Sequence, residues 1–558
     1  MNPLLLVDSY KIHHTKMYPE GMTKLYSNGT CRKSRIPGVD KVVVFGIQHF
    51  VQEYLIKLFN EEFFGHVEND EGESWRNSPT WKSSIINEYK KHCPVDTTHI
   101  EALWDLGYLP IEIKALDEGT LCPIGVPMLT ITNTHPDFGW LVNYLETLIS
   151  CSLWQSYTSA TIAFEYKKLL TKYAKETDEK NIDFIQWQGH DFSMRGMSSV
   201  ESSVLSGMGH LLSFTGTDTI PAIYALEKSY GATGLIGASV PATEHSVMCM
   251  GTKESEIDTF KRLLNLYPTG ILSVVSDTWD LWKVCTEYLP QLKEEILARD
   301  GKLVIRPDSG DPVDIICGDA WRVQGFTEGV LNKVGENGVV LNYTDNKYYK
   351  VKLNSNHEVY GEETTDVTPA NKGVIELLWD IFGGTINEQG YKVLDPHIGA
   401  IYGDSITLER AEQICERLKA KGFASTNVVF GIGSFTYQYN TRDTFGFAMK
   451  ATYGEVKVHS SKCASTECTC EGPYCEKTVE CREIWKDPIT DDGTKKSKKG
   501  LLVVGTGGKM IPGGSTLICD DQCTWEEEQT GLLTTVFHNS KLIKTTTLQE
   551  IRTKLNNY

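Results

Sequence analysis

The 558-residue chain carries 55 Lys and Arg against 73 Asp and Glu, which gives a formal charge of -18. This excess of negative charge argues against a general nucleic-acid binder, which needs a basic face. Hydrophobic residues make up 40% and charged residues 23% of the chain, the balance of a folded globular enzyme rather than a disordered or fibrous protein. At this length a single hydrophobic core usually stops growing, so we expect two domains or one large barrel with an addition.

The apolar stretches and the cysteines of the chain predict its cellular compartment. The apolar run before Asp8 is too short for the core of a signal peptide, and no later stretch approaches a membrane span. The 15 cysteines are scattered through a long chain, so most of them should be reduced thiols, many buried as small hydrophobes. We therefore expect a cytoplasmic protein.

Four segments share an apolar, β-branched run followed by Gly or an acidic residue, and helical patterns follow two of them. They are residues 271–277, 302–308, 398–404 and 427–434. Continuous apolar runs are typical of parallel strands buried on both faces, so the pattern predicts a β/α barrel or a doubly wound sheet. Ligands bind at the carboxyl ends of strands in both architectures. Asp277, Asp308 and Asp404 fall there; each alone would pass as a helix cap, but three in register, one beside an Arg, predict a site.

Residues 190–196, HDFSMRG, place an aromatic ring, a cation and a glycine before a helix rich in small residues. A helix start beside Arg195 is a natural anion site, and Phe192 offers its face to a flat heteroaromatic ring. From these residues alone, the simpler reading is that Arg195 pairs with a nearby Asp and that Phe192 is core. The motif is suggestive rather than specific.

His245 lies in SVPATEHS, a polar stretch between apolar segments. A histidine in such a loop can take a proton, bind a metal or accept a phosphoryl group, although a lone histidine is more often structural. Metal binding is the weaker functional reading, because no His or Cys at a spacing of three or four residues completes a ligand set.

The most specific short motif is IRPDSGDP, residues 305–312. Arg306 supplies positive charge, Asp308 suits sugar hydroxyls, and Gly310 lets the backbone approach a ribose phosphate. GIGS at 431–434 forms a second glycine-containing loop, with Arg442 eight residues on, but it lacks the third glycine of a dinucleotide fingerprint. GTGGK at 505–509 is not a Walker loop, and a hairpin turn explains it better.

Taken in order, nine motifs resemble those of the nicotinamide phosphoribosyltransferases, a family of type II phosphoribosyltransferases. They are DSYK at 8–11, HDFSMRG, GTDT, PATEHS, SVVSD, IRPDSG, YGD, FGIG and TRD, and they span nearly the whole chain. The resemblance implies an α/β fold with an irregular (β/α) barrel over 146–435, flanked by an α+β domain built from 1–145 and 436–558. It also implies a homodimer with active sites at the subunit interface.

The resemblance assigns roles to individual residues. Phe192 and Tyr10 of the partner subunit would sandwich the nicotinamide ring, and Asp218 would accept a hydrogen bond from its carboxamide. His245 would be the phosphorylated histidine, with Asp277 orienting its imidazole. The remaining groups would hold phosphoribosyl pyrophosphate: Arg306, Asp308, Gly403, Asp404 and Ser434 around the ribose and phosphate, and Arg195, Arg32, Arg442, Lys450 and Lys486 as positive charge.

Loss of pyrophosphate from the sugar leaves an oxocarbenium-like centre, so the reaction needs positive charge on the leaving group and a positioned ring nitrogen. We therefore expect Mg²⁺, held mainly through the substrate phosphates, and the resemblance implies ATP as the phosphoryl donor to His245. The added phosphate would tighten Mg²⁺ and substrate binding in one state of the cycle.

The sequence departs from the family pattern at four places. Ser434 stands where a further glycine is usual, and Ala448 where a serine commonly contributes to phosphate binding. Residues 313–371 form a first insertion, and its short β-like segments predict a hairpin module. Residues 459–482 form a second insertion, which we expect to be a mobile surface loop. The second insertion is rich in cysteine, but the spacing of its cysteines is not that of a zinc knuckle, so zinc binding is the weaker reading. These cysteines are Cys463, Cys468, Cys470, Cys475 and Cys481.

Two rival functions stay open. A nicotinate phosphoribosyltransferase must neutralise a substrate carboxylate, which an aspartate at 218 would repel. A catalytically weak nucleotide-binding dimer on the same fold is the other rival, and the presence of His245, Asp277, Arg306 and Asp308 together argues against it.

Overall fold

The computed structural model describes residues 1–66, 78–459, 477–490, 496–511 and 514–558. The chain divides into two compact units. Unit 1 comprises Met1–Thr161, Tyr224–Gly234 and Asn440–Tyr558, and unit 2 comprises Ile162–Ile223 and Leu235–Tyr439. Among the described residues, none of the helices combines the length and apolar character that a membrane crossing requires.

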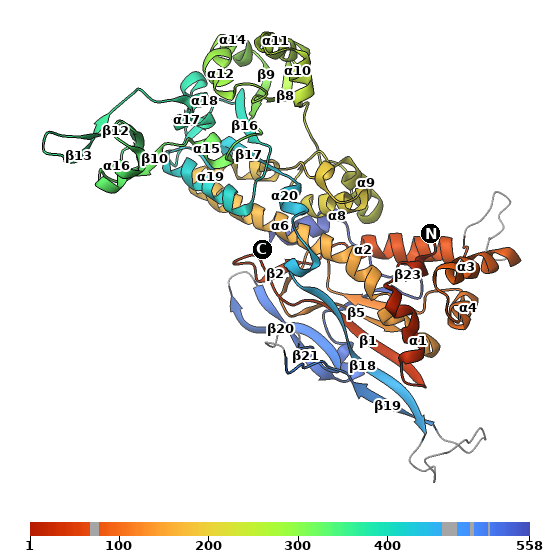
Figure 1. The fold of residues 1–558 in the computed structure, drawn as a ribbon. Helices are drawn as coiled ribbons and strands as arrows, with labels where there is room; N and C mark the ends of the chain where they lie inside the picture. Colours follow the sequence, from red (N-terminus) through yellow and green to blue (C-terminus); the bar gives the residue numbers. More distant parts are fainter. Residues whose placement is uncertain (67–77, 460–476, 491–495, 512–513) are drawn as a thin grey trace. The chain divides into compact units, whose positions relative to one another are not determined.

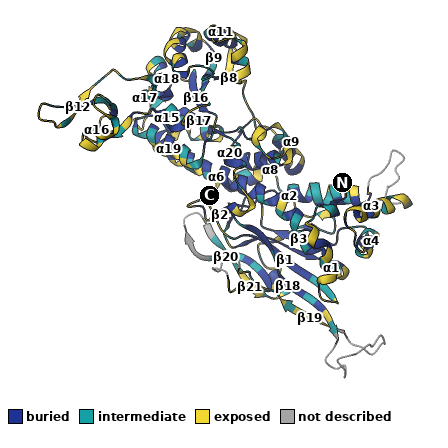
Figure 2. Ribbon diagram, viewed as in Figure 1, coloured by how far each residue is buried: buried dark blue, intermediate teal, exposed yellow. Residues whose placement is uncertain are grey.

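Unit 1 is built on a seven-stranded antiparallel sheet with the order β19-β18-β1-β5-β3-β22-β23 (Figure 1). The strands are β1 (Met22–Cys31), β3 (Ile111–Ala115), β5 (Pro127–Asn133), β18 (Phe447–His459), β19 (Lys477–Glu483), β22 (Thr534–His538) and β23 (Lys541–Leu542). The central strands are buried over most of their length (Figure 2). Gly29 in β1 shows how tight the sheet is, because a Cβ there would lie 3.0 Å from the side chain of Leu129. The sheet therefore contributes a large part of the hydrophobic core of unit 1.

Helices of unit 1 bury apolar side chains in the same core. They include α2 (Ile47–Phe50), which continues as the π-helix η3 (Val51–Phe63), then α3 (Pro79–His92) and α4 (Thr98–Leu106). In η3 the residues Val51, Leu55, Phe59 and Phe63 are buried at helical spacing. This mixture of helices and an antiparallel sheet is the α+β arrangement expected for the flanking domain.

Unit 2 is built on a six-stranded sheet in which all neighbouring strands are parallel, with the order β7-β6-β17-β16-β9-β8. The strands are β6 (Gly189–Asp191), β7 (Gly216–Thr217), β8 (Thr269–Val275), β9 (Asp300–Arg306), β16 (Ile398–Tyr402) and β17 (Val428–Ile432). The last four confirm the four predicted strand segments. Each of these strands buries its apolar run, which is why continuous apolar runs in the sequence predicted them correctly.

A short segment links the two edges of this sheet. Ala238 makes a parallel bridge to Gly216 of β7, and Ala242 makes one to Ser273 of β8. Since β7 and β8 are the edge strands, residues 238–242 join one edge to the other. The result is an irregular parallel barrel, which confirms the predicted fold class.

Helices follow the strands, as in other β/α folds. The main ones are α8 (Val200–His210), α10 (His245–Met250), α11 (Glu256–Leu266), α15 (Pro312–Cys317), α18 (Val374–Phe382) and α19 (Leu408–Ala420). The sequence predicted α19 well, because its apolar residues recur at helical spacing and Thr407 caps its start by accepting from the Arg410 amide.

The first insertion forms a small module. Its sheet has the order β10-β11-β12-β13, from Trp321–Val323, Val339–Asn342, Lys347–Leu353 and Val359–Glu363, and carries the helix α16 (Glu328–Val334). Val323, Val340 and Val351 are its buried core. The module is thus larger than a hairpin.

One local expectation was wrong. GTGGK lies inside the strand β20 (Leu501–Ile511), which pairs with β21 (Gly514–Cys523), rather than at a turn.

Candidate active site

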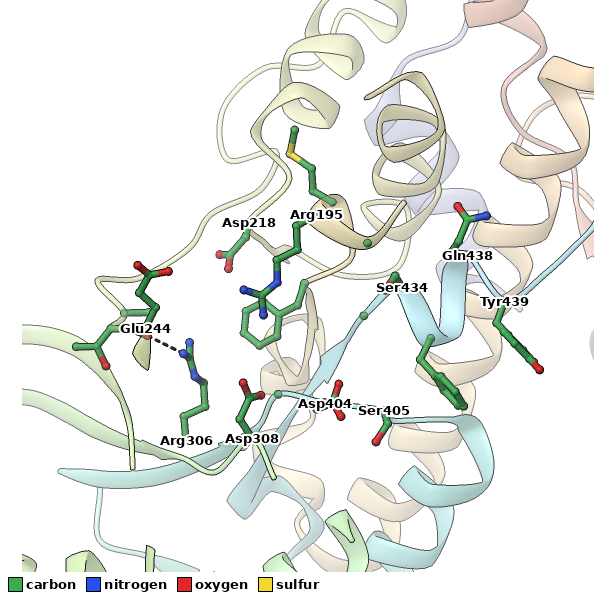
Figure 3. A pocket seen from close by; sticks show the side chains of 18 residues that line it. Arg195, Asp218, Glu244, Arg306, Asp308, Asp404, Ser405, Ser434, Gln438 and Tyr439 are labelled. Atoms are coloured by element: carbon green, nitrogen blue, oxygen red, sulfur yellow. Dashed lines mark hydrogen bonds between the residues drawn. The ribbon is translucent and has the colours of Figure 1, made fainter. Parts of the chain in front are cut away.

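A cavity of about 1020 Å³ lies at the carboxyl ends of the unit 2 strands. Its wall residues come from the loops after β6, β7, β9, β16 and β17 and from the segment that joins the sheet edges. They are Phe192, Met194, Arg195, Gly196, Asp218, Ala242, Thr243, Glu244, Arg306, Asp308, Gly403, Asp404, Ser405, Gly433, Ser434, Phe435, Gln438 and Tyr439 (Figure 3). The parallel sheet therefore brings together motifs that are separated by up to about 250 residues.

One wall of the cavity is aromatic. His190 is the middle residue of β6 and Phe192 directly follows the strand, so strand alternation puts both side chains on one side of the chain. Their rings lie 4.7 Å apart between centroids at 49°. Two glycines leave room for them, because a Cβ at Gly216 would lie 2.7 Å from Nδ1 of His190, and one at Gly431 would lie 2.6 Å from Cδ2 of Phe192. The wall is thus shaped to receive a flat ring.

Asp218 follows β7 and faces the same wall. Its Oδ1 lies 3.0 Å from Nε2 of His190 and also accepts from the Ser239 hydroxyl. Burial alone would raise the pKa of the Asp218 carboxyl, but the hydrogen bonds from His190 and Ser239 and the charges of His190 and Arg306 outweigh it, so the pKa is lowered. Asp218 is therefore an ionised hydrogen-bond acceptor at neutral pH.

Arg306 ends β9 and gives the cavity positive charge. One terminal nitrogen of its guanidinium donates to the Thr243 carbonyl at 2.6 Å (Figure 3), whereas its Nε is buried and bonded to none of the described residues. Burial lowers the pKa of Arg306 most, and Arg195 lowers it further against the opposing effect of Asp308. Two guanidinium groups thus share this part of the cavity, an arrangement suited to an anion.

His245 is the first residue of α10, and its side chain is about half exposed, at 48%. Its Nδ1 lies 3.0 Å from Oγ1 of Thr278, and its Nε2 lies 3.9 Å from Oδ2 of Asp308. Asp277 does not orient the imidazole here. Its Oδ2 instead accepts from the Asp308 amide at 2.8 Å and the Ser309 hydroxyl at 2.6 Å. The side chain after Asp277, rather than Asp277 itself, contacts the histidine.

Two further glycines make room for charged or polar side chains of the site. A Cβ at Gly403 would lie 2.5 Å from Oδ1 of Asp308, and one at Gly196 would lie 2.1 Å from Oγ of Ser434. From the sequence, Gly310 was expected to let the backbone approach a phosphate, and residues 431–434 were expected to form a second phosphate loop. In the structure Gly431 admits a neighbouring side chain, as do Gly196, Gly216 and Gly403.

The other predicted residues lie in unit 1 and form their own group. Burial lowers the pKa of Lys450, and the charges of Arg32, Lys486 and Arg442 lower it further, while Glu146 opposes them. Arg32 and Lys450 line a cavity of about 430 Å³ together with Lys496 and Lys498. Ala448 lines it as well. Tyr10, at the other end of the chain, is 61% exposed.

Sequence reasoning missed three polar residues: His190, Ser239 and Thr278. The alternation in His-Asp-Phe could have placed His190 beside Phe192. The contacts of Ser239 with Asp218 and of Thr278 with His245 join residues that are 21 and 33 positions apart in the chain, and no local pattern encodes them. The stacked rings of Phe435 and Tyr439, at the edge of the cavity, were also missed.

Within the described part of the chain, no group of three or more His, Cys, Asp or Glu side chains is arranged to hold a metal ion. Cys463, Cys468, Cys470 and Cys475 lie outside the described residues, and Cys481 is an exposed thiol in β19.

Comparison with known proteins adds evidence over the whole chain. Residues 187–541 match the model of the nicotinate phosphoribosyltransferase (NAPRTase) family, and residues 2–97 match the N-terminal domain of nicotinamide phosphoribosyltransferase. The chain is 46% identical to a nicotinamide phosphoribosyltransferase of Acinetobacter baylyi, over 100% of this chain and 97% of the relative. It is 36% identical to one of Mycoplasma pneumoniae, over 80% and 88%. A solved nicotinate-nucleotide pyrophosphorylase of Pyrococcus furiosus aligns with a TM-score of 0.49 at 12% identity, over 100% of this chain and 95% of that chain.

Proposed function

Because this chain belongs to the nicotinate phosphoribosyltransferase family, we propose that it transfers the phosphoribosyl group of phosphoribosyl pyrophosphate to nicotinamide. The products are nicotinamide mononucleotide and pyrophosphate, and the enzyme serves NAD salvage in the cytoplasm. The observation that carries this proposal is the cavity itself, where the Phe192 ring wall and the Asp218 acceptor lie beside the paired cations Arg195 and Arg306.

The geometry supports a direct displacement. Nicotinamide stacks on Phe192 with its carboxamide N–H donating to Asp218, which aims the ring nitrogen at the anomeric carbon of the ribose. The bond from this carbon to the pyrophosphate oxygen breaks, and the bond to the ring nitrogen forms with the electron pair of that nitrogen. Arg306 and Arg195 stabilise the charge that develops on the leaving group, and Asp308 and Asp404 hold the ribose hydroxyls.

A divalent cation fits this chemistry, and one observation tests the fit. Oδ1 of Asp277 is buried and bonded to none of the described residues, so it is an available carboxylate oxygen close to Asp308. Mg²⁺ typically keeps most of its ligands as water and substrate phosphate and takes one or two carboxylates from the protein. Asp277 and Asp308 would hold it, and it would supply charge neutralisation on the pyrophosphate.

His245 is proposed to accept the γ-phosphoryl group of ATP, with release of ADP. The Thr278 hydroxyl engages Nδ1, which leaves Nε2 as the attacking nitrogen. The ring is half exposed, so a nucleotide can reach it. The added phosphate would bring negative charge beside Asp308 and tighten cation and pyrophosphate binding in that state.

This role is tested with His245→Ala. We expect loss of ATP hydrolysis and of the ATP-dependent gain in affinity, while slow uncoupled transfer remains. Mass spectrometry should find an acid-labile phosphate on the wild type at His245 only. Phosphate on another residue, or ATPase activity that survives in the variant, rules the assignment out.

The basic group of unit 1 is proposed to bind the substrate phosphates in the active site of the other subunit of a homodimer, and Tyr10 is proposed to complete that same site. The basic group consists of Arg32, Arg442, Lys450 and Lys486. The exposure of Tyr10 and the crowding of positive charge around Lys450 support this arrangement. It is tested by mixing Tyr10→Ala and Arg306→Ala subunits, since a heterodimer then has one intact site. Partial return of activity is expected; heterodimers that stay as inactive as the parents place the whole site within one chain.

Product analysis distinguishes this function from its two rivals. The protein is incubated with phosphoribosyl pyrophosphate, ATP, Mg²⁺ and either nicotinamide or nicotinate, and the mononucleotides are separated by chromatography. We expect nicotinamide mononucleotide almost exclusively, because the ionised Asp218 carboxylate repels the carboxylate of a bound nicotinate. Equal use of nicotinate contradicts the role of Asp218, and no product with either base favours a binding protein.

A further inference from the structure

The two oxygens of the Asp218 carboxylate have different surroundings. Oδ1 is engaged by both Nε2 of His190 and the hydroxyl of Ser239, whereas the described residues make no hydrogen bond to Oδ2. Asp218 is also one of the residues that line the large cavity. The carboxylate is thus held by one oxygen and presents the other.

We propose that His190 and Ser239 are positioning residues that hold Asp218 with Oδ2 toward the ring slot, and that they set the preference for a neutral carboxamide over a carboxylate. This inference rests on the proposed function and deepens it. Neither residue is required to touch the substrate, because each acts through Asp218.

The barrel explains why the two donors arrive together. Asp218 follows β7, and β7 has one hydrogen-bonded neighbour on each side: β6, which carries His190, and the segment that carries Ser239. Gly216 of β7 is the partner of His190 on one side and of Ala238 on the other. The donors therefore come from both flanks of the strand that delivers the carboxylate, and closing the barrel is what brings the second donor in.

The His190 ring has little freedom to move away. Its side chain is only 12% exposed. The Phe192 ring contacts one part of it, and the missing Cβ of Gly216 leaves a space that Nδ1 enters. A ring held in this way can direct one nitrogen at one carboxylate oxygen.

The electrostatics agree with a pure acceptor. The charged groups that act on Asp218 are His190, from β6, and Arg306, from β9. Together with the Ser239 hydrogen bond they keep the carboxyl ionised despite burial. An ionised carboxylate accepts hydrogen bonds and donates none, so its free oxygen pairs with the N–H of a carboxamide and repels a second carboxylate.

The experiment removes each donor and then restores one. His190→Leu and Ser239→Ala remove a donor, and His190→Gln keeps an N–H at about the reach of Nε2. His92→Leu, an exposed histidine at the end of α3, is the matched control. Initial rates are measured across pH 4 to 8 with nicotinamide and with nicotinate at saturating phosphoribosyl pyrophosphate. Phosphoribosyl pyrophosphate is also varied at saturating nicotinamide, and nicotinamide binding is measured by calorimetry.

We expect each lost donor to lower kcat/KM for nicotinamide about tenfold, the size of one charged hydrogen bond. The loss should lie mainly in KM, with kcat for nicotinamide and KM for phosphoribosyl pyrophosphate nearly unchanged, and nicotinate should lose less, so the selectivity narrows. The acid limb of the profile should move to higher pH, because Asp218 loses what lowers its pKa. His190→Gln should recover most of the selectivity.

Two results overturn the inference. One is wild-type selectivity in both His190→Leu and Ser239→Ala; the other is an equal loss for both bases that His190→Gln fails to recover, which is the result of a purely structural role. Should His190→Leu not fold, the Ser239→Ala and His190→Gln pair still decides between these outcomes. Failure of the proposed function can be distinguished from failure of this inference, because in the first case the wild-type protein makes no product from nicotinamide.

Discussion

Gly216 and His190 lie so close together that a Cβ at position 216 would come within 2.7 Å of Nδ1 of the imidazole. The imidazole occupies the space that a side chain at position 216 would need, so any larger residue there displaces the histidine from Asp218. We expect Gly216→Ala to raise KM for nicotinamide about as much as loss of the hydrogen bond does, roughly tenfold. Steady-state kinetics measure this.

The control for this variant is Gly325→Ala, because a Cβ there meets no atom within 4 Å. It should leave the kinetics unchanged. Wild-type KM in Gly216→Ala would mean that the ring adjusts without leaving Asp218, and would contradict the tight fit.

Ser434 and Gly196 form a second close pair, and they permit a rescue test. A Cβ at 196 would lie 2.1 Å from Oγ and 2.6 Å from Cβ of Ser434. We expect Gly196→Ala to lower activity strongly and Gly196→Ala with Ser434→Gly to recover much of it, since the second change removes both clashing atoms. The single change Ser434→Gly only removes these two atoms, so it should be tolerated. Additive losses in the double variant would contradict the packing.

Much of this site could be predicted from the sequence, because strand ends and motif residues are local features. The runs before Asp277, Asp308 and Asp404 indicated parallel strands, and the structure places the last two acids in the cavity wall. The strand patterns alone left a barrel and a doubly wound sheet open, because the closing segment, residues 238–242, contains Pro241 and makes only isolated bridges, so it carries no strand pattern.

The partners of the site residues were also beyond sequence reasoning. Thr278 rather than Asp277 contacts His245, and the choice between adjacent residues depends on the backbone at the end of β8. Similarly, His190 and Asp218 are 28 residues apart and meet only because β6 and β7 pair. Pairing in space, not local propensity, makes these contacts.

Lys114 and Glu528 form a buried ion pair in unit 1. Lys114 Nζ lies 2.5 Å from Oε2 of Glu528, and their side chains are 7% and 2% exposed. Removal of one partner leaves a buried, uncompensated charge, so we expect Lys114→Met to cost about 3–5 kcal/mol of stability. Lys114→Met with Glu528→Leu should recover much of that loss. Thermal unfolding of the single and double variants measures both effects.

An exposed pair provides the comparison. Lys57 and Glu53 lie 3.3 Å apart on the surface of η3, and such pairs contribute about 0.3–0.5 kcal/mol. Lys57→Met should therefore barely change the unfolding temperature. A loss as small in Lys114→Met would show that water reaches the Glu528 carboxylate.

Glu118 predicts a pH dependence of stability in unit 1. Its carboxylate accepts from the Gln48 amide at 2.7 Å and the Gly46 amide at 3.3 Å, but burial dominates and raises the pKa of Glu118 from 4.5 to about 7. A raised pKa means that the folded state holds the proton more tightly than the unfolded state. This contribution to stability is therefore complete below about pH 4.5, falls as the pH rises, and is lost above about pH 7.

The variant Glu118→Gln isolates this effect, because an amide stays neutral at every pH. The unfolding temperature of the variant, relative to that of the wild type, should rise steadily between about pH 4.5 and pH 7 and then stay constant. The corresponding gain in the free energy of unfolding is about 1.4 kcal/mol for each unit by which the pKa of Glu118 is raised. The control Glu20→Gln changes an exposed glutamate and should give a flat difference. A flat difference for Glu118→Gln as well would mean that the two backbone amides hold the ionised carboxylate well enough to offset its burial.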